Sequence, residues 1–168
     1  MEVDQKEKFK APMEKIVPIE PCKTGKKKWI EEHDFTDKIE LLTGVIKGLL
    51  SPENPGIQRV IVKSKRKSNN AKGKKWSRRR SQYIGVSKNG TSYQVLIAVD
   101  GRKTYLGSFE DETEAAVTFD FYSILLHSVE ANTNFSYTAS SIKEMITNYR
   151  LFNNTFNAAY YLQSNILM

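Results

Sequence analysis

Residues 83–109 read YIGVSKNGTSYQVLIAVDGRKTYLGSF, and this stretch decides the fold. Asn89-Gly90 and Asp100-Gly101 are dipeptides typical of tight hairpin turns, because a type I′ turn needs positive φ angles at both central residues. Between the turns the side chains alternate, with one set at Tyr93, Val95, Ile97 and Val99 and the other at Gln94, Leu96 and Ala98. This period of two predicts three short antiparallel strands whose sheet has two distinct faces.

The sequence after residue 109 predicts a helix that covers one of these faces. Asp111 with Glu114 three residues later is a capping-box pattern, and acids suit the positive end of a helix dipole. The buried stripe recurs at helical spacing, at Ala115, Phe119, Tyr122 and Leu126. The expected fold class is α+β: a three-stranded antiparallel sheet packed on one α-helix, with extra N- and C-terminal helices and a disordered basic arm.

Charges are distributed unevenly along the chain. Of its 26 Lys and Arg, twelve lie between Glu53 and Asp100, where no Asp or Glu occurs, and the other fourteen stand against nineteen acids. Ten of the twelve fall in residues 63–80, KSKRKSNNAKGKKWSRRR, a composition that cannot form a packed core. Such an arm favours a polyanion as its partner. A solvated linker and a nuclear-localisation signal stay open as alternatives.

Further helices are predicted on either side of the sheet. One helical face after Asp34 carries Phe35, Ile39, Leu42, Ile46 and Leu49, and it packs either on the protein's own core or on a partner protein. Val60 to Val62 suggests a short strand. Beyond Thr138, two helices are expected at about 140–150, with Ile142, Met145, Ile146 and Tyr149 inward, and at about 154–163, with Phe156, Tyr160 and Tyr161 prominent.

These patterns divide the chain into five segments. They are an extended tail at 1–33, an amphipathic helix and short strand at 34–62, the basic arm at 63–80, the sheet-and-helix domain at 81–138 and a C-terminal helical extension at 139–168. Within the tail, Lys26-Lys27-Lys28-Trp29 is a candidate anchoring point, because a Trp beside cations is unusual in a linker.

Several residues within 81–135 also match a known family in order. They are the strand Tyr83-Ile84-Gly85-Val86, the aromatic-x-Val-x-Ile of the second strand, Tyr105-Leu106-Gly107-Ser108-Phe109, Glu114-Ala115-Ala116, Asp120 and Asn132-Thr133-Asn134-Phe135. This third of the chain resembles the Apetala-two (ethylene-response-factor) DNA-binding domain, in a variant more similar to the protist branch than to the plant one. The resemblance implies that the uncovered sheet face lies in the major groove of DNA, which a sheet can enter.

By position, the resemblance implies six groove-facing residues: Ile84, Ser87, Leu96, Ala98, Lys103 and Tyr105. The plant pattern has Arg, Glu or Trp at most of these sites, whereas here only Lys103 is charged and Tyr105 keeps an aromatic ring. Lys88 and Arg102 are nearby cations suited to phosphates. From the arm, the expected DNA contacts are Lys75, Trp76, Arg78, Arg79 and Arg80. Phosphate contacts position a protein on DNA without reading its sequence, and an apolar open face is also typical of a protein interface.

Two functional hypotheses follow. In the first, the protein is a nuclear DNA-binding protein, a transcription regulator or chromatin-associated factor, which holds duplex DNA with the sheet and the arm, with RNA as a further nucleic-acid partner. In the second, it is a non-catalytic subunit of a larger complex, with protein partners on the helix of Phe35, Ile39, Leu42, Ile46 and Leu49, on the C-terminal helices or on the apolar sheet face.

We expect neither an enzyme nor a cofactor or metal site. His33 and His127 are isolated in the sequence, and Cys22 has no second cysteine with which to build a zinc site or a disulfide. No apolar run approaches the ~20 residues that span a bilayer, so we expect no membrane partner.

Overall fold

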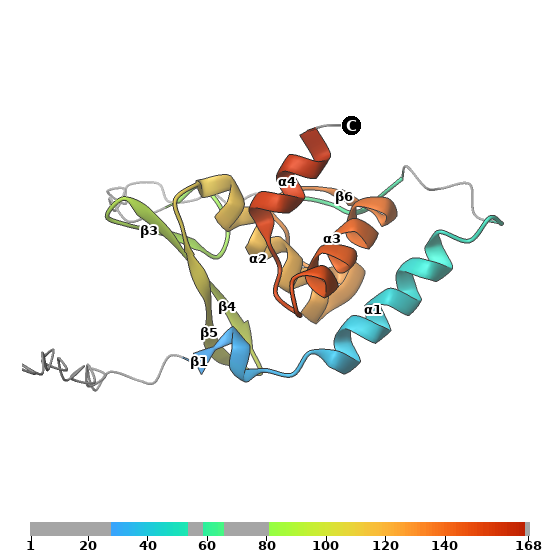
Figure 1. Ribbon diagram of the computed structural model, residues 1–168, viewed down its shortest axis with the longest axis horizontal. Helices are drawn as coiled ribbons and strands as arrows, with labels where there is room; N and C mark the ends of the chain where they lie inside the picture. Colours follow the sequence, from blue (N-terminus) through green and yellow to red (C-terminus); the bar gives the residue numbers. More distant parts are fainter. Residues whose placement is uncertain (1–27, 54–58, 66–80, 167–168) are drawn as a thin grey trace, which may run out of the picture.

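The computed structural model describes residues 28–53, 59–65 and 81–166. One outer layer of the fold is a sheet in the strand order β1-β5-β4-β3 (Figure 1). Strands β3 (Val86–Asn89), β4 (Ser92–Val99) and β5 (Arg102–Phe109) are antiparallel, as the sequence predicts. Strand β1 (Lys28–Trp29) adds two residues in parallel along the free edge of β5. The α+β fold class with its three-stranded antiparallel sheet is confirmed.

The two hairpin turns differ from each other. Asp100 and Gly101 have φ angles of 50° and 75°, which a type I′ turn requires at both central positions. In the first hairpin Asn89 is still paired with Ser92 in the ladder, so Gly90 and Thr91 form the turn and only Gly90, at 61°, is positive. Glycine at the first central position is typical of a type II′ turn, so the prediction that Asn89 is a central turn residue was wrong.

Helix α2 (Glu112–His127) covers one face of the sheet and begins as predicted at Asp111. The Asp111 side chain accepts hydrogen bonds from the backbone N–H groups of Thr113 and Glu114, at 2.8 and 2.9 Å. Every residue from Ala115 to Leu125 is buried, instead of a single stripe. The reason is that other helices cover the side of α2 that faces away from the sheet, so α2 forms a middle layer (Figure 1).

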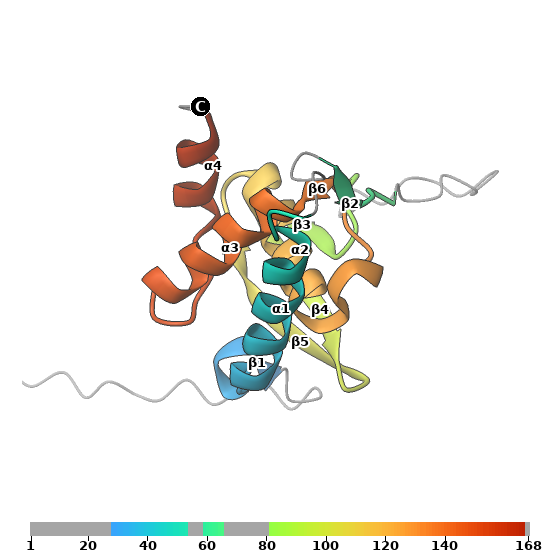
Figure 2. The same cartoon turned by 90° about the vertical axis from the view of Figure 1, so that its right-hand side faces the viewer.

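The other outer layer consists of α1 (Thr36–Leu49), α3 (Ala139–Leu151) and α4 (Ala158–Ile166) (Figure 2). The α1 face of Phe35, Ile39, Leu42 and Ile46 is buried against α2 and α3, so the protein's own core covers it. On α3, the predicted inward residues Ile142, Met145, Ile146 and Tyr149 are all buried. Helix α4 begins at Ala158, later than predicted. Phe156, in the loop before α4, packs against Phe121 of α2, with the two ring centroids 4.5 Å apart.

Short elements complete the chain. Strand β2 (Val60–Val62), as predicted, pairs antiparallel with β6 (Tyr137–Thr138), and the 3-10 helices η1 (Ile30–Glu32) and η2 (Ser128–Glu130) follow β1 and α2. Residues 28–33 belong to the folded domain through β1, η1 and the buried side chain of Ile30, so the described end of the predicted tail is structured. The core therefore draws on residues from Ile30 to Tyr161.

Candidate nucleic-acid interface

The sheet face turned away from α2 is the candidate interface, and we call it the open face. Strand pairing places its side chains in four rows across the sheet. The first row is Asn89 and Ser92, the second is Ser87, Gln94 and Ser108, the third is Leu96, Tyr105 and Trp29, and the last is Ala98 and Lys103. Five of the six residues that the resemblance assigns to the groove, all except Ile84, lie in these rows.

Exposure follows this arrangement. Ser87, Ala98 and Lys103 are exposed, and Leu96 and Tyr105 are half-buried without belonging to the hydrophobic core. The other set of β4 side chains is buried against α2, with Val95 at 0%, Ile97 at 7% and Val99 at 3% exposure. The alternation predicted from the sequence therefore separates core from open face.

Trp29 extends this face beyond the region of family resemblance. It pairs with Tyr105 across the β1–β5 edge, the two rings meet edge to face with centroids 4.7 Å apart, and the Trp29 side chain is 53% exposed. Sequence reasoning did not include Trp29 among the site residues. The only signal was a tryptophan next to a run of lysines, because a two-residue strand leaves no periodicity to detect.

Two of the predicted phosphate contacts occupy positions on the other side of the sheet. Arg102 pairs with the buried Val99, and Lys88 pairs with Tyr93, whose ring centroid lies 5.9 Å from the Lys88 Nζ atom. Because directly opposed residues share a face, both cations belong to the α2 side at the ends of their strands. Lys103 is thus the only cation at an open-face position of β3, β4 and β5.

The backbone of Ile84 is held by the side chain of Asn134. The Asn134 side chain accepts a hydrogen bond from the Ile84 N–H at 2.6 Å and donates one to the Ile84 carbonyl at 3.2 Å. The Ile84 side chain is half-buried and packs against the core. This residue therefore fixes the start of β3 more than it lines the open face.

Asp120 organises the same junction from within α2. Its buried carboxylate accepts four hydrogen bonds of 2.7–3.0 Å, from the Asn134 and Phe135 N–H groups, the Asn134 amide and the Tyr137 hydroxyl. Burial raises the pKa of Asp120 to about 6, while these hydrogen bonds oppose the rise by favouring the charged form. The Asp120 and Asn134 positions of the resemblance thus have a structural role, which is to join α2, β3 and the loop before β6.

Both ends of the basic segment are fixed beside this junction. The Lys65 N–H donates to the Thr133 carbonyl at 2.8 Å, the Ser64 N–H donates to the Ser136 hydroxyl at 3.0 Å, and the Ser81 hydroxyl donates to Glu112 at 2.6 Å. The predicted contacts Lys75, Trp76, Arg78, Arg79 and Arg80 lie outside the described residues. These bonds fix Lys65 and Ser81, the described residues on either side of positions 66–80, to the folded domain.

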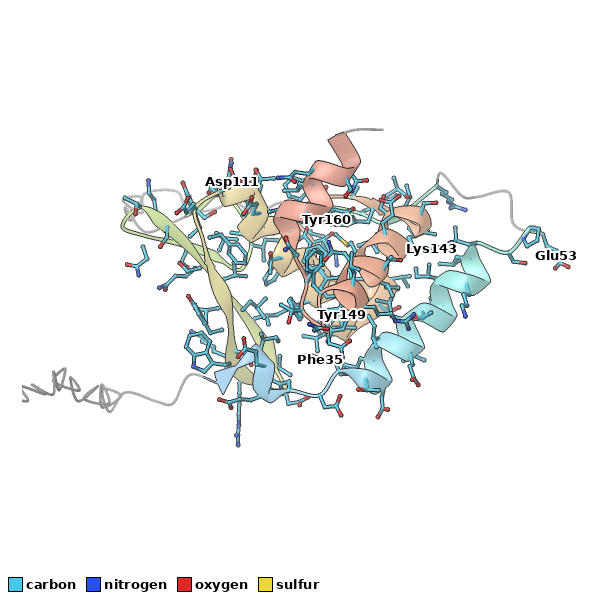
Figure 3. The ribbon with its side chains drawn as sticks, viewed as in Figure 1. Phe35, Glu53, Asp111, Lys143, Tyr149 and Tyr160 are labelled. Carbon is cyan, nitrogen blue, oxygen red and sulfur yellow. The ribbon has the colours of Figure 1, made fainter. Side chains whose placement is uncertain are left out.

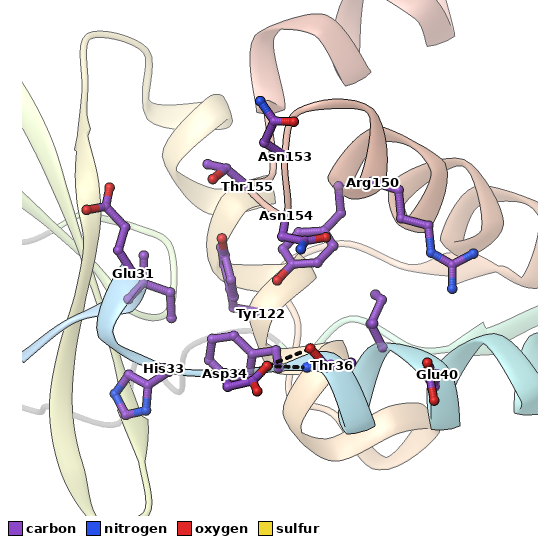
Figure 4. Close-up of a pocket in the computed structure, with 14 residues that line it drawn as sticks. Glu31, His33, Asp34, Thr36, Glu40, Tyr122, Arg150, Asn153, Asn154 and Thr155 are labelled. Atoms are coloured by element: carbon purple, nitrogen blue, oxygen red, sulfur yellow. Dashed lines mark hydrogen bonds between the residues drawn. The ribbon is translucent and has the colours of Figure 1, made fainter.

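A separate cleft of about 400 Å³ lies between η1, the start of α1, Tyr122 of α2 and the loop after α3 (Figure 4). Its charged side chains include Glu31, Asp34, Glu40 and Arg150. Asp34 accepts hydrogen bonds from the Thr36 N–H and hydroxyl, at 2.9 and 2.6 Å, which lower the pKa of its carboxyl and hold the start of α1. Arg150 donates to the Thr43 hydroxyl at 3.1 Å, so it joins α3 to α1.

Within residues 28–53, 59–65 and 81–166, no group of three or more His, Cys, Asp or Glu side chains is arranged to hold a metal ion. None of the helices in the same ranges is long and apolar enough to cross a membrane.

The chain matches no protein-family model, and no curated protein matches it. The Apetala-two resemblance therefore rests on the residues quoted for it.

Proposed function

We propose that this protein binds DNA through its open face and its basic segment, as a nuclear transcription regulator or chromatin-associated factor. The observation that carries the proposal is the charge pattern of the open face. Its rows in β3, β4 and β5 contain Lys103 and no acidic residue, although the chain as a whole holds nineteen acids. A polyanion meets no repulsion at these positions.

The anchoring of the basic segment supports the same proposal. Residues 66–80 contain eight Lys and Arg, and the flanking residues are tied to the folded domain through the Lys65 N–H on one side and the Ser81 hydroxyl on the other. Cations next to such anchors can attract phosphates without any base contact. Duplex DNA is the form of nucleic acid that the family resemblance implies.

The proposal is tested by measuring the affinity of the full chain for a labelled duplex, with Lys103→Ala compared with Lys143→Ala. Lys143 is an exposed residue of α3, on the far side of the molecule from the sheet (Figure 3). Both variants remove one positive charge, so nonspecific attraction falls equally. We expect Lys103→Ala to bind several-fold more weakly than Lys143→Ala. Equal affinities of the two variants would contradict a role for the open face.

A second candidate function is that of a structural subunit in a larger complex. A groove of about 410 Å³ runs between α3 and α4, and Leu151 and Tyr160 on its walls are 61% and 48% exposed. Exposed apolar side chains lining a groove are typical of a protein interface. If this function holds, the protein purified from its own cells carries a stoichiometric partner, and Leu151→Lys releases that partner whereas Leu41→Lys, at an exposed site of α1, does not. A monomer without a partner would contradict it.

A further inference from the structure

The open face carries an apolar row that spans three strands, with aromatic rings on two of them. Trp29 of β1, Tyr105 of β5 and Leu96 of β4 are direct neighbours by strand pairing. Adjacent strands lie about 4.8 Å apart, so the row extends roughly 10 Å across the sheet. Trp29 lies at the outer end of this row and is 53% exposed, more than any other described Trp, Tyr or Phe side chain.

The composition of the open face does not suit the reading of base edges in a duplex groove. Base edges are read by hydrogen-bonding side chains, above all by Arg, Asn and Gln. Most of the face has no Asn, Gln or Ser, because these side chains all lie in the two rows nearest the β3–β4 turn, at Ser87, Asn89, Ser92, Gln94 and Ser108. At the centre of this face, Leu96 and Ala98 have no side-chain donor or acceptor, and Lys103 is the only charged group in the rows of β3, β4 and β5. Its large surfaces are therefore apolar and aromatic, with one cation beside them.

Such a surface complements the flat faces of bases. In a duplex these faces are stacked on neighbouring base pairs and are inaccessible, whereas an unpaired strand exposes them. Stacking of a base on an aromatic side chain is sequence-tolerant, because every base has a π face, and a positively charged neighbour follows the backbone. Lys103 lies in the row next to Tyr105 and is placed to meet a phosphate of a strand whose bases stack there.

We propose that the open face binds unpaired nucleotides, with a base stacked on the exposed ring of Trp29, which the perpendicular ring of Tyr105 supports, and the backbone beside Lys103. This inference rests on the proposed function, since it names the form of nucleic acid that the same face accepts. The proposal also assigns a role to β1, which lies outside the region that resembles the Apetala-two domain. The pairing of β1 with β5 places Trp29 next to Tyr105.

The first test compares affinities of the full chain at a fixed salt concentration for three probes: a single-stranded DNA of about 12 nucleotides, the RNA strand of the same sequence, and the DNA duplex. We expect at least one single strand to bind about tenfold more tightly than the duplex, and the stronger of the two strands shows whether the natural partner is DNA or RNA. Duplex binding as tight as that of both strands overturns the inference and leaves the proposed function intact. If none of the probes binds, both the inference and the proposed function fail.

The second test uses Trp29 itself. Trp29→Ala is expected to weaken single-strand binding about 5- to 100-fold, which is the usual effect of removing one base-stacking aromatic side chain. Trp29→Phe keeps a stacking ring and should stay within a few-fold of the wild type. The matched control is Leu151→Ala, which removes an apolar side chain of α3 that is 61% exposed. An unchanged affinity of Trp29→Ala for the single strand overturns the inference.

Fluorescence supplies a direct readout of stacking that a merely structural role would not change. The chain contains two tryptophans, so in a Trp76→Phe background Trp29 is the sole tryptophan emitter. Addition of the single strand should quench this emission in a saturable manner, with a midpoint equal to the dissociation constant measured independently. Saturated binding without quenching of Trp29 overturns the inference.

Discussion

At the scale of single residues, Gly85 shows how closely the sheet approaches α2. Its φ angle is +74°, which side chains rarely adopt, and a Cβ atom there would overlap the ring of Phe119. Gly85 therefore has two independent reasons to be glycine, the backbone angle and the adjacent ring.

We expect Gly85→Ala to lower the free energy of unfolding by more than about 3 kcal/mol, because the ring must move and the backbone is strained. The control is Gly44→Ala in α1, where a Cβ meets nothing within 4 Å. That variant should raise stability by about 0.5–1 kcal/mol, since alanine favours a helix over glycine. Chemical denaturation measures both values. A Gly85→Ala loss below about 1 kcal/mol would contradict the close packing described here.

Asp120 gives a prediction that depends on pH. Burial raises the pKa of its carboxyl from 3.8 to about 6, so the folded state holds the proton more tightly than the unfolded chain does. The resulting stabilisation is present in full below pH 3.8 and is lost as the pH rises through 6. Relative to Asp120→Asn, which does not titrate, the wild type should lose up to roughly 3 kcal/mol between pH 4 and 7, at about 1.4 kcal/mol per pH unit.

Denaturation of both proteins at several pH values measures this difference, and other titrating groups cancel in the comparison. A wild type that gains stability relative to Asp120→Asn over the same pH range would show that the four hydrogen bonds outweigh burial. Tyr137→Phe removes one of these hydrogen bonds, from a hydroxyl 2.8 Å from Asp120 Oδ2. It is expected to cost about 1.5–3 kcal/mol above pH 6, where the carboxylate is charged, and about 0.5–1.5 kcal/mol near pH 4, where it is protonated.

At the scale of elements, the start of α2 depends on one carboxylate. We expect Asp111→Ala to lower the free energy of unfolding by about 1 kcal/mol, because the N–H groups of Thr113 and Glu114 lose their acceptor. Asp111→Asn keeps an oxygen at this position and should cost much less. Thermal or chemical denaturation compares the two, and equal losses would show that the charge of Asp111 matters more than its hydrogen bonds.

The elements predicted correctly are those with strong local signals. Asp100-Gly101, the alternation around Val95 and the Asp111 cap each act over a few residues, and the structure confirms all three. Strand β1 could not be predicted, because its pairing with β5 joins residues more than seventy positions apart. The complete burial of α2 was missed for a related reason: the helices that cover its outer side come from both ends of the chain.

The candidate site was predicted in part. Positions transferred from the resemblance onto strands, such as Leu96 and Lys103, lie on the open face because strand period fixes which side they take. The same period places Arg102, one residue before Lys103, on the opposite side. Arg102 was expected as a contact because it neighbours Lys103 in the sequence, whereas only Lys103 occupies a row of the open face.

At the scale of the whole molecule, the structure is a layered domain that keeps one sheet face uncovered within the described part of the chain. Helix α2 and the outer helices bury the other face. The open face, with Trp29 and Lys103, lies on the same folded unit that anchors both ends of the basic segment. This arrangement gives a single surface both a stacking group, Trp29, and a cation, Lys103, which is what the proposed nucleic-acid contact requires.

The salt dependence of binding tests this account most directly. The full chain is titrated with a labelled duplex and with one of its strands, from about 50 to 200 mM salt. This range includes the physiological ionic strength of about 150 mM. For about six to eight phosphate contacts, we predict that the log–log slope of affinity against salt is near −0.9 per contact for the duplex and near −0.7 for the strand. Absence of binding to both at the lowest salt, or binding that does not change with salt, would contradict the central claim that this protein holds nucleic acid.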